Sequence, residues 1–141
     1  MNEISLGLIG VGIVGNAFYE GMKHAFKIIR YDKNKSEQSD VSNIHDLLNV
    51  VNGPIFVCVP TPMQSDGTAS IKNVSDIIDE IKFSNKEHDK KIVVIKSTVP
   101  PRTCEQLNNK FLSVSIVFNP EFLTEKNPVE DFKNQDRIIL G

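Results

Sequence analysis

A chain of 141 residues is long enough to bury the core of one domain and too short for two, so we expect a single domain over residues 1–141. Its 40% apolar and 24% charged residues exclude a disordered chain, and its net charge of −2 gives no surplus for binding nucleic acid or an anionic membrane. The sequence shows neither an apolar stretch that could span a bilayer nor a secretory signal, which predicts a cytoplasmic protein.

Six short, almost unbroken apolar runs predict the strands of a parallel sheet that is covered on both faces. They occupy residues 4–9, 28–31, 55–59, 92–95, 115–118 and 138–140. Between the strands, apolar residues recur at helical spacing at Val11, Val14, Phe18, Met22 and Ala25, and again at Val74, Ile77, Ile78 and Ile81. This alternation predicts an α/β fold of the Rossmann type, a doubly wound parallel sheet with the strand order 3-2-1-4-5-6. Ser70 is the predicted N-cap of the later helix, and the polar residues 84–91 are predicted to connect it to the fourth strand.

A glycine-rich turn follows the first predicted strand and opens the first predicted helix. Gly10, Gly12 and Gly15 form the pattern G-x-G-x-x-G. The first glycine permits a tight turn, the second lets backbone approach a pyrophosphate, and the third lets the helix pack closely on the strand. Free N–H groups at the start of the helix, near Ile13 and Val14, then face the phosphates. The turn therefore predicts a dinucleotide site.

Asp32 ends the second predicted strand, about twenty residues after the glycines, where dinucleotide-binding proteins place an acidic residue. A carboxylate there accepts hydrogen bonds from the adenosine ribose and repels a 2′-phosphate, which predicts NAD in preference to NADP. Lys33, a predicted cofactor contact, and Lys35 leave the other cofactor open, because basic residues near this point accommodate a 2′-phosphate. The remaining alternative is that Asp32 only caps a turn.

Three loops follow the third, fourth and fifth predicted strands, whose carboxyl ends lie at one edge of the sheet. Their sequences are Val59-Pro60-Thr61-Pro62, Lys96-Ser97-Thr98-Val99-Pro100-Pro101 and Asn119-Pro120-Glu121-Phe122-Leu123-Thr124-Glu125. Prolines fix such loops in extended form, and hydroxyls and carboxylates supply the polar groups of a ligand site, so we expect Thr61, Thr98, Glu121 and Glu125 to face one crevice. The predicted cofactor contacts in these loops are Val59, Pro60, Thr61, Ser97, Thr98 and Glu125.

Together these motifs resemble the N-terminal domain of the UDP-glucose/GDP-mannose dehydrogenase family. The resemblance also includes Asp66-Gly67, Asp131-Phe132 and Asp136-Arg137, and it covers essentially the whole chain. It implies NAD-dependent oxidation of the 6-hydroxyl of a nucleotide sugar to a carboxylate, through a covalent adduct on a cysteine. It further implies that Thr98 and one of Glu121 or Glu125 are catalytic. Three residues depart from the family pattern: Ser70 replaces an aspartate, and Arg102 and Lys126 replace glycines.

Neither cysteine matches the nucleophile motif of the family. Cys58 lies in an apolar run and Cys104 follows a proline pair, and both are expected to be reduced structural thiols. The resemblance therefore implies the NAD-binding part of the enzyme without the half that carries the catalytic cysteine. A UDP-sugar and a second polypeptide with that half are candidate partners. The histidines, His24, His45 and His88, share no metal-ligand spacing, so no metal site is expected.

Two other functions remain open from the sequence alone. One is a non-catalytic NAD sensor or regulatory module, which needs only the glycine turn and the acidic residue. The other is a short relative of other NAD-dependent dehydrogenases, such as the β-hydroxyacid group. The three strand-end loops favour the nucleotide-sugar dehydrogenase, because a sensor has no need of Thr98 or Glu121.

Overall fold

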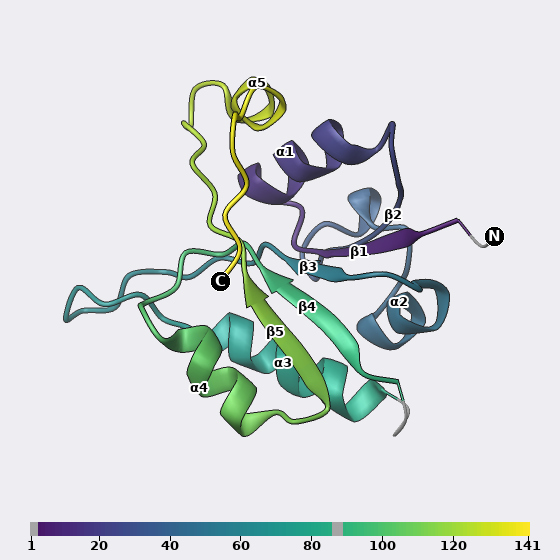
Figure 1. Ribbon diagram of the computed structural model, residues 1–141, viewed down its shortest axis with the longest axis vertical. Coiled ribbons are helices and arrows are strands. Elements are labelled where there is room, and N and C mark those ends of the chain that lie inside the picture. Colours follow the sequence, from purple (N-terminus) through teal and green to yellow (C-terminus); the bar gives the residue numbers. More distant parts are fainter. Residues whose placement is uncertain (1–2, 86–88) are drawn as a thin grey trace.

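The computed structural model describes residues 3–85 and 89–141, and its strands form one parallel sheet with helices on both faces (Figure 1). The strands are β1 (Ser5–Ile9), β2 (Lys27–Tyr31), β3 (Ile55–Val57), β4 (Lys91–Ile95) and β5 (Val114–Phe118). The helices are α1 (Ile13–Met22), α2 (Ile44–Val50), α3 (Lys72–Ser84), α4 (Thr103–Lys110) and α5 (Pro128–Lys133), with a short 3-10 helix, η1 (Ser36–Gln38). The predicted α/β fold of the Rossmann type is confirmed. His88 and the middle of the predicted connection 84–91 lie outside the described residues.

The strand order is β2-β1-β3-β4-β5, so the predicted order 3-2-1-4-5-6 is wrong. A third strand beside β2 would need its outer edge, and the chain already covers that edge. The Asp40 N–H donates to the Arg30 carbonyl at 2.8 Å, and the Arg30 N–H donates to the Asp40 carboxylate at 2.9 Å. The chain instead crosses the sheet through α2 and places β3 beside β1. The order therefore changes direction between β1 and β3, the kind of switch point where α/β proteins bind ligands.

Residues 138–140 were predicted to form a sixth parallel strand, and this prediction is wrong. The described sheet has five strands, and these residues are not among them. The side chains of Ile138 and Leu140 are 71% and 65% exposed, far from the burial of a sheet strand. Only Gly141 joins β5, where it exchanges both backbone hydrogen bonds with Phe118, at 2.6 and 2.9 Å. Such an exchange is the pattern of an antiparallel pair. The segment therefore meets β5 in the direction opposite to a sixth parallel strand.

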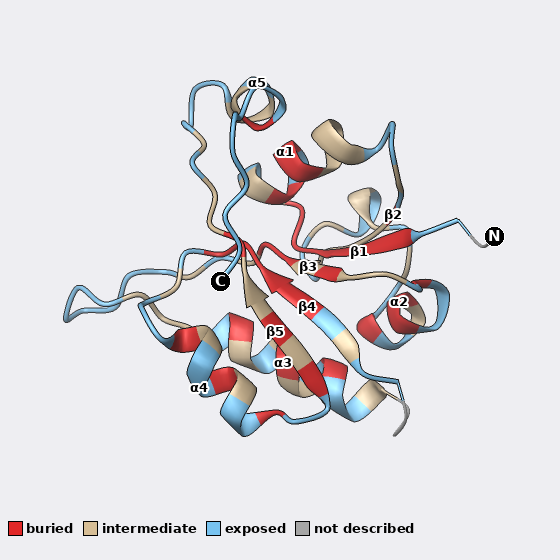
Figure 2. Cartoon of the chain, viewed as in Figure 1, coloured by how far each residue is buried: buried red, intermediate tan, exposed pale blue. Residues whose placement is uncertain are grey.

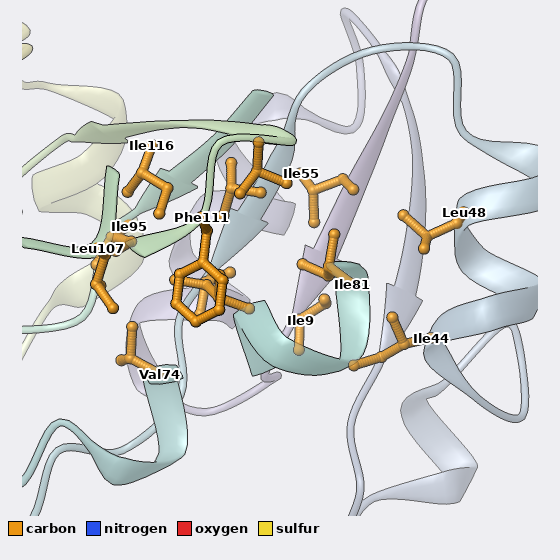
Figure 3. Close-up of a cluster of buried hydrophobic side chains, with 14 of the residues drawn as sticks. Ile9, Ile44, Leu48, Ile55, Val74, Ile81, Ile95, Leu107, Phe111 and Ile116 are labelled. Carbon is orange, nitrogen blue, oxygen red and sulfur yellow. The ribbon is translucent and has the colours of Figure 1, made fainter. Parts of the chain in front are cut away.

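The larger apolar core lies between the sheet and helices α2, α3 and α4 (Figures 2 and 3). Figure 3 shows isoleucines of β1, β3, β4 and β5 meeting Val74 and Ile81 of α3, with Phe111 just after α4. Val74, Ile78 and Ile81 are fully buried and lie on one face of α3, as the helical spacing predicts. This core fixes the strands laterally without supplying side chains for a ligand.

The smaller core lies on the opposite face, between the sheet and helices α1 and α5 (Figure 1). The rings of Phe18 and Phe132 meet edge to face with their centroids 5.8 Å apart, a favourable arrangement for aromatic pairs. Phe132 belongs to the Asp131-Phe132 motif, so this motif has a packing role. No helix among the described residues is long and apolar enough to cross a membrane.

Local capping explains helices that the apolar spacing did not reveal. Asn43 caps α2, since its side chain accepts a hydrogen bond from the Asp46 N–H at 2.8 Å, and Pro128 opens α5. The prediction of Ser70 as the N-cap of α3 is wrong by one residue. The helix begins at Lys72 after Ile71, and the Ser70 hydroxyl accepts only a long bond of 3.4 Å from the Lys72 N–H.

An extended arm projects beyond β3 and is the long loop at the far left of Figure 1. Met63 and Ala69 form an antiparallel bridge within it, and the Gln64 N–H donates to the Thr68 carbonyl at 2.7 Å. Gly67 has a φ of +84° at the tip, which a glycine adopts without strain. The Asp66-Gly67 motif is therefore the turn of this arm.

At the carboxyl edge, the register aligns one residue from each strand. The last paired residues of the five strands lie side by side across the sheet: Tyr31, Ile9, Val57, Ile95 and Phe118. The residues that directly follow them form the next row, which we call the carboxyl row: Asp32, Gly10, Cys58, Lys96 and Asn119. Backbone hydrogen bonds of 2.8 to 2.9 Å continue the ladder into this row, from Cys58 to Ile9, from Lys96 to Val57 and from Asn119 to Ile95. The row therefore has the same rigidity as the strands.

The packing of α5 on α1 predicts the effect of a larger side chain at Gly21. A Cβ atom there would lie 2.2 Å from the Phe132 ring, far inside van der Waals contact. Gly21→Val should lower the free energy of unfolding by about 1–3 kcal/mol, the usual cost of overpacking, as measured by urea denaturation. Combining it with Phe132→Ala should cost less than the sum of the two single changes. Strictly additive costs would show that the two positions do not clash.

Candidate functional site

A cavity of about 620 Å³ opens at the carboxyl edge of the sheet, over the switch point between β1 and β3. Its size suits a small-molecule or cofactor site. The lining comes from residues that follow β2, β1, β3 and β4, and from one face of α3. The cavity therefore crosses four neighbouring strand ends in the order in which they lie in the sheet.

Two of the three glycines of the turn are required by the packing of the chain itself, and the third is not. A Cβ on Gly10, whose φ is +93°, would lie 2.6 Å from the Cys58 carbonyl oxygen, and one on Gly15 would lie 1.9 Å from the Gly10 carbonyl oxygen. The chain's own packing therefore demands glycine at both positions. A Cβ on Gly12 would meet nothing within 4 Å, because this residue faces open space beside the cavity. Only Gly12 is left for close approach by a ligand, and Ile13 and Val14 line the cavity next to it.

Asp32 lies at the cavity wall with its carboxylate fixed by backbone. One oxygen accepts a hydrogen bond from the Val11 N–H at 2.7 Å, and the other accepts from the Asn34 N–H at 2.9 Å. Each carboxylate oxygen has a further lone pair for a ligand hydroxyl. Asp32 thus ties the loop after β2 to the glycine turn and can still bind a ribose.

Lys35 is the basic residue that reaches this turn, and sequence reasoning did not include it among the contacts. Its ammonium donates to the Val11 carbonyl at 2.8 Å, whereas the predicted contact Lys33 is exposed at the cavity wall. The difference arises from the turn after Asp32, which directs the two lysines differently. Neither spacing nor composition distinguishes them.

The loops after β3 and β4 are joined by hydroxyl groups. The Thr61 hydroxyl donates to the Thr98 carbonyl at 2.6 Å, and the buried Ser97 hydroxyl donates to the Val59 carbonyl at 2.7 Å. Both threonines line the cavity, as do Val59, Pro60 and Ser97. The hydroxyl of Ser97 is therefore engaged by backbone, while Thr98 is exposed at the cavity.

One wall of the cavity comes from α3 and was not foreseen. Asn73, Asp76, Ile77 and Glu80 recur at helical spacing beside the buried stripe of the same helix, and Tyr31 lines the cavity with them. Burial raises the pKa of Tyr31, and the nearby carboxylates of Glu80 and Asp32 raise it further. Polar residues on an amphipathic helix look like an ordinary solvated face, so no sequence pattern indicates this wall.

The two predicted glutamates do not line the cavity. They lie on the loop between β5 and α5, where Glu121 accepts a hydrogen bond from the Leu123 N–H at 2.7 Å and Glu125 is exposed. The loop is anchored further along by Asp131, which accepts a bond from the Thr124 N–H at 2.8 Å. Hydrogen bonds from Thr124 lower the pKa of Asp131. Thr61 and Thr98 share the cavity, and a crevice that also includes the glutamates stays a prediction.

Both cysteines are free and in settings that favour the neutral thiol. Burial raises the pKa of Cys58 to about 12, and partial burial raises the pKa of Cys104. A thiol nucleophile needs a lowered pKa. Within residues 3–85 and 89–141, no group of three or more His, Cys, Asp or Glu side chains is placed to hold a metal ion.

The family model for the NAD-binding domain of the UDP-glucose/GDP-mannose dehydrogenase family matches residues 49–141. The chain belongs to this family. The UDP-glucose 6-dehydrogenase of Rickettsia typhi is 40% identical over 114 residues, which is 76% of this chain and 25% of that protein. The chain therefore spans about a quarter of that relative's length.

Solved structures of the family match nearly the whole chain, including the glycine turn and Asp32, which precede the range of the family model. A UDP-glucose dehydrogenase from Pyrobaculum islandicum matches with a TM-score of 0.86 and 25% identity, over 99% of this chain and 41% of that one. A GDP-mannose dehydrogenase from Pseudomonas aeruginosa shares the fold, with a TM-score of 0.80 and 19% identity over 96% of this chain and 40% of that one. NAD is the cofactor of this domain.

Arg102 is the departure from the family pattern with a visible structural consequence. It has a φ of +70° at the N-cap of α4, a left-handed conformation in which a non-glycine residue is strained. Its guanidinium lies 3.2 Å from the Glu105 carboxylate, and both side chains are exposed. The glycine that the family motif carries at this position suits this backbone, whereas Arg102 adopts it at a cost.

The geometry of the turn predicts opposite effects of the same change at two glycines. Gly12→Ala should lower the free energy of unfolding by no more than about 1 kcal/mol, because a methyl group there meets no protein atom and the remaining cost is that of a poorer N-cap for α1. It should nevertheless raise the Kd for NAD by about tenfold or more in a calorimetric titration, because the methyl group occupies the approach to the backbone. Gly15→Ala, the matched control, should destabilise the fold itself. Unaltered NAD binding by a folded Gly12→Ala variant would contradict this assignment.

Proposed function

We propose that these 141 residues form the cofactor-binding part of a nucleotide-sugar 6-dehydrogenase of the UDP-glucose type. The supporting observation is the order of groups beneath the cavity. Along the carboxyl row, an acidic residue, the glycine turn and the threonine loops follow one another as Asp32, Gly10 and the ends of β3 and β4. A dinucleotide has the same order of parts: ribose, pyrophosphate, then the second nucleoside.

The adenosine half of NAD is assigned to the β2 side of the cavity. Asp32 would accept hydrogen bonds from the ribose hydroxyls, and Tyr31 and Ile77, which line this side of the cavity, would offer apolar surface to adenine. Lys35 lies beside the ribose, where its charge attracts the phosphates, and Lys33 stands at the rim. Both lysines would also attract a 2′-phosphate, so the preference for NAD depends on the repulsion of that phosphate by Asp32.

The pyrophosphate is assigned to the space at Gly12 and the start of α1. The N-cap of α1 has no side-chain hydrogen bond, so the first N–H groups of this ten-residue helix are left for a ligand. The helix dipole adds to the attraction of negative charge there. Gly12, Ile13 and Val14 are the residues that approach the phosphates.

The nicotinamide half is then assigned to the ends of β3 and β4, beside Val59, Thr61 and Thr98. The cofactor supplies the hydride acceptor for oxidation of the sugar 6-hydroxyl. Thr98, exposed at the cavity, orients the reacting group, and Glu121 or Glu125 takes the proton directly or through a water. The glutamates lie on the loop after β5 and do not line the cavity, so the bound substrate would have to lie between that loop and Thr98.

The nucleophilic cysteine of the second oxidation is proposed to come from outside these residues. Cys58 is buried with its pKa at about 12, and Cys104 is half-buried with a raised pKa, so neither forms a thiolate readily near neutral pH. A UDP-sugar should bind weakly to these residues alone, because only the Glu121 side of its site is present. A second polypeptide, or any segment that brings the cysteine, would complete the site.

Asp32→Ser tests the cofactor assignment. The unaltered chain should bind NAD more tightly than NADP, because the carboxylate repels a 2′-phosphate. The substitution should narrow the ratio of the two Kd values by about tenfold, measured by competition between the cofactors. Lys33→Ser is the control and should change the ratio in the opposite direction, since removing a rim cation takes away attraction for a 2′-phosphate and leaves the repulsion by Asp32 in place. Equal affinity of the unaltered chain for both cofactors would refute the assignment.

Turnover assays test the proposal that these residues bind the cofactor and that the nucleophilic cysteine comes from elsewhere. The purified 141 residues should bind NAD and should not produce NADH when UDP-glucose is added, because no activated thiol is present. Adding a polypeptide that carries the cysteine-bearing half should restore NADH production, and Thr98→Ala or Glu121→Gln should then abolish it. Turnover by the chain alone that survives both substitutions would show that the reacting centre is misplaced. NAD binding without turnover in any assembly would favour the regulatory module.

A further inference from the structure

Lys96 is a buried ammonium group for which the proposed reaction has no role. The residue is 4% exposed, and its Nζ donates to the Asn119 side-chain oxygen at 2.8 Å. Among the described residues it forms no ion pair within 4.0 Å. Lysine is almost never fully buried unless it is paired, because removing its charge from water is costly. Such a group is retained where its charge serves a purpose.

The surroundings of Lys96 compensate its charge only in part. Cys58 and Asn119 flank it in the carboxyl row, and the Phe132 ring of α5 lies 5.8 Å from its Nζ. Burial lowers the pKa of Lys96, whereas Cys58 and Glu121 act in the opposite direction. Because the pKa of Cys58 is raised to about 12, its thiol is neutral near neutral pH. Glu121 is therefore the one acidic group, among the described neighbours, whose charge opposes that of Lys96.

The carboxyl row gives the position of Lys96 relative to the cofactor. Lys96 follows β4, two strands from Gly10 and three strands from Asp32. Neighbouring strands lie about 4.8 Å apart, so Lys96 is about 10 Å from the glycine turn and about 14 Å from the ribose site. With the ribose on Asp32 and the phosphates on the turn, as proposed above, the nicotinamide ring would extend toward Lys96, which lines the cavity.

We propose that Lys96 biases the site toward the reduced cofactor: its ammonium repels the positively charged nicotinamide ring of NAD⁺ and leaves the neutral ring of NADH unaffected. This inference rests on the proposed placement of the cofactor. By linkage, tighter binding of NADH makes bound NAD⁺ a stronger hydride acceptor by the same factor. Lys96 thus promotes oxidation of an alcohol without contacting the substrate.

A purely structural role for Lys96 makes a different prediction. Lys96 holds Asn119, whose side-chain NH₂ donates to the Ile139 carbonyl at 2.8 Å, so its loss loosens the edge of the sheet. Loosening weakens the binding of NAD⁺ and NADH to the same extent, because the two share every part except the charge of one ring. The ratio of their Kd values therefore separates charge from structure.

The test measures the Kd of NAD⁺ and of NADH for the unaltered chain and for Lys96→Met, which keeps the length of the side chain and removes its charge. The ratio Kd(NAD⁺)/Kd(NADH) should fall by about tenfold or more, the effect of unit charges no more than about 10 Å apart at an effective dielectric constant of about 20. Lys35→Met is the matched control, because Lys35 lies at the ribose end, which both forms share. It should weaken both forms and leave the ratio unchanged.

A pH titration provides a second measurement, whose main arm uses the unaltered chain and so does not depend on the folding of a variant. As the pH rises, Lys96 deprotonates before the ionisable groups around it change charge, because burial lowers its pKa, the pKa of Cys58 is about 12, and carboxyl groups are already ionised near neutral pH. The ratio should fall with rising pH in the unaltered chain and stay constant in Lys96→Met. A constant ratio in the unaltered chain, or the same ratio in a folded Lys96→Met variant, would overturn the inference. Failure of the unaltered chain to bind either form would instead refute the proposed function beneath it.

Discussion

The candidate site depends on one constraint, the in-register parallel pairing of neighbouring strands at their carboxyl ends. This pairing fixes Asp32, Gly10, Cys58 and Lys96 in one row, and the backbone ladder continues through the row itself. The spacing between the acidic residue, the turn and the buried lysine is therefore set by the sheet, which is stiff, and not by loops. A shift of one residue in any strand would turn its row residue to the opposite face. The loops only add hydroxyl groups to a framework that is already in place.

The same row explains why two of the three glycines in the turn tolerate no side chain. Gly10 lies so close to the Cys58 carbonyl, and Gly15 to the Gly10 carbonyl, that a Cβ at either position would overlap backbone. Close packing of α1 on β1 and β3 is what brings the start of that helix to the cavity. The geometry of the proposed phosphate site is thus a by-product of core packing, and only Gly12 is free of that packing. For this reason an alanine at Gly15 is expected to affect the stability of the fold, whereas an alanine at Gly12 is expected to affect ligand binding.

The sequence allowed the prediction of features that local patterns determine, and failed where long-range contacts decide. Apolar runs located the five strands, and the glycine pattern located the turn, because both depend on neighbouring residues. The strand order depends on Asp40 covering the edge of β2, which no apolar pattern records. Residues 138–140 have the composition of a strand, yet they are exposed and only Gly141 pairs with β5. Lys96 likewise reads as an ordinary lysine at a strand end, and only the register shows that it is buried between Cys58 and Asn119.

The two faces of the sheet have different relations to the site. The side chains of Ile9, Val57 and Ile95 enter the larger core. This core therefore fixes the strand ends that precede the carboxyl row, and it contributes no polar group to the site. The next residue of each strand points to the opposite face, where Cys58 joins the smaller core and Lys96 approaches Phe132. The loop that carries Glu121 is therefore held at both ends by that smaller face. Asn119 bonds to Lys96 at its start, and Asp131 and Phe132 anchor its end through Thr124 and Phe18. Any approach of Glu121 to Thr98 must come from the chain between these two anchors, so the geometry of the proposed reacting centre is tied to the buried charge of Lys96.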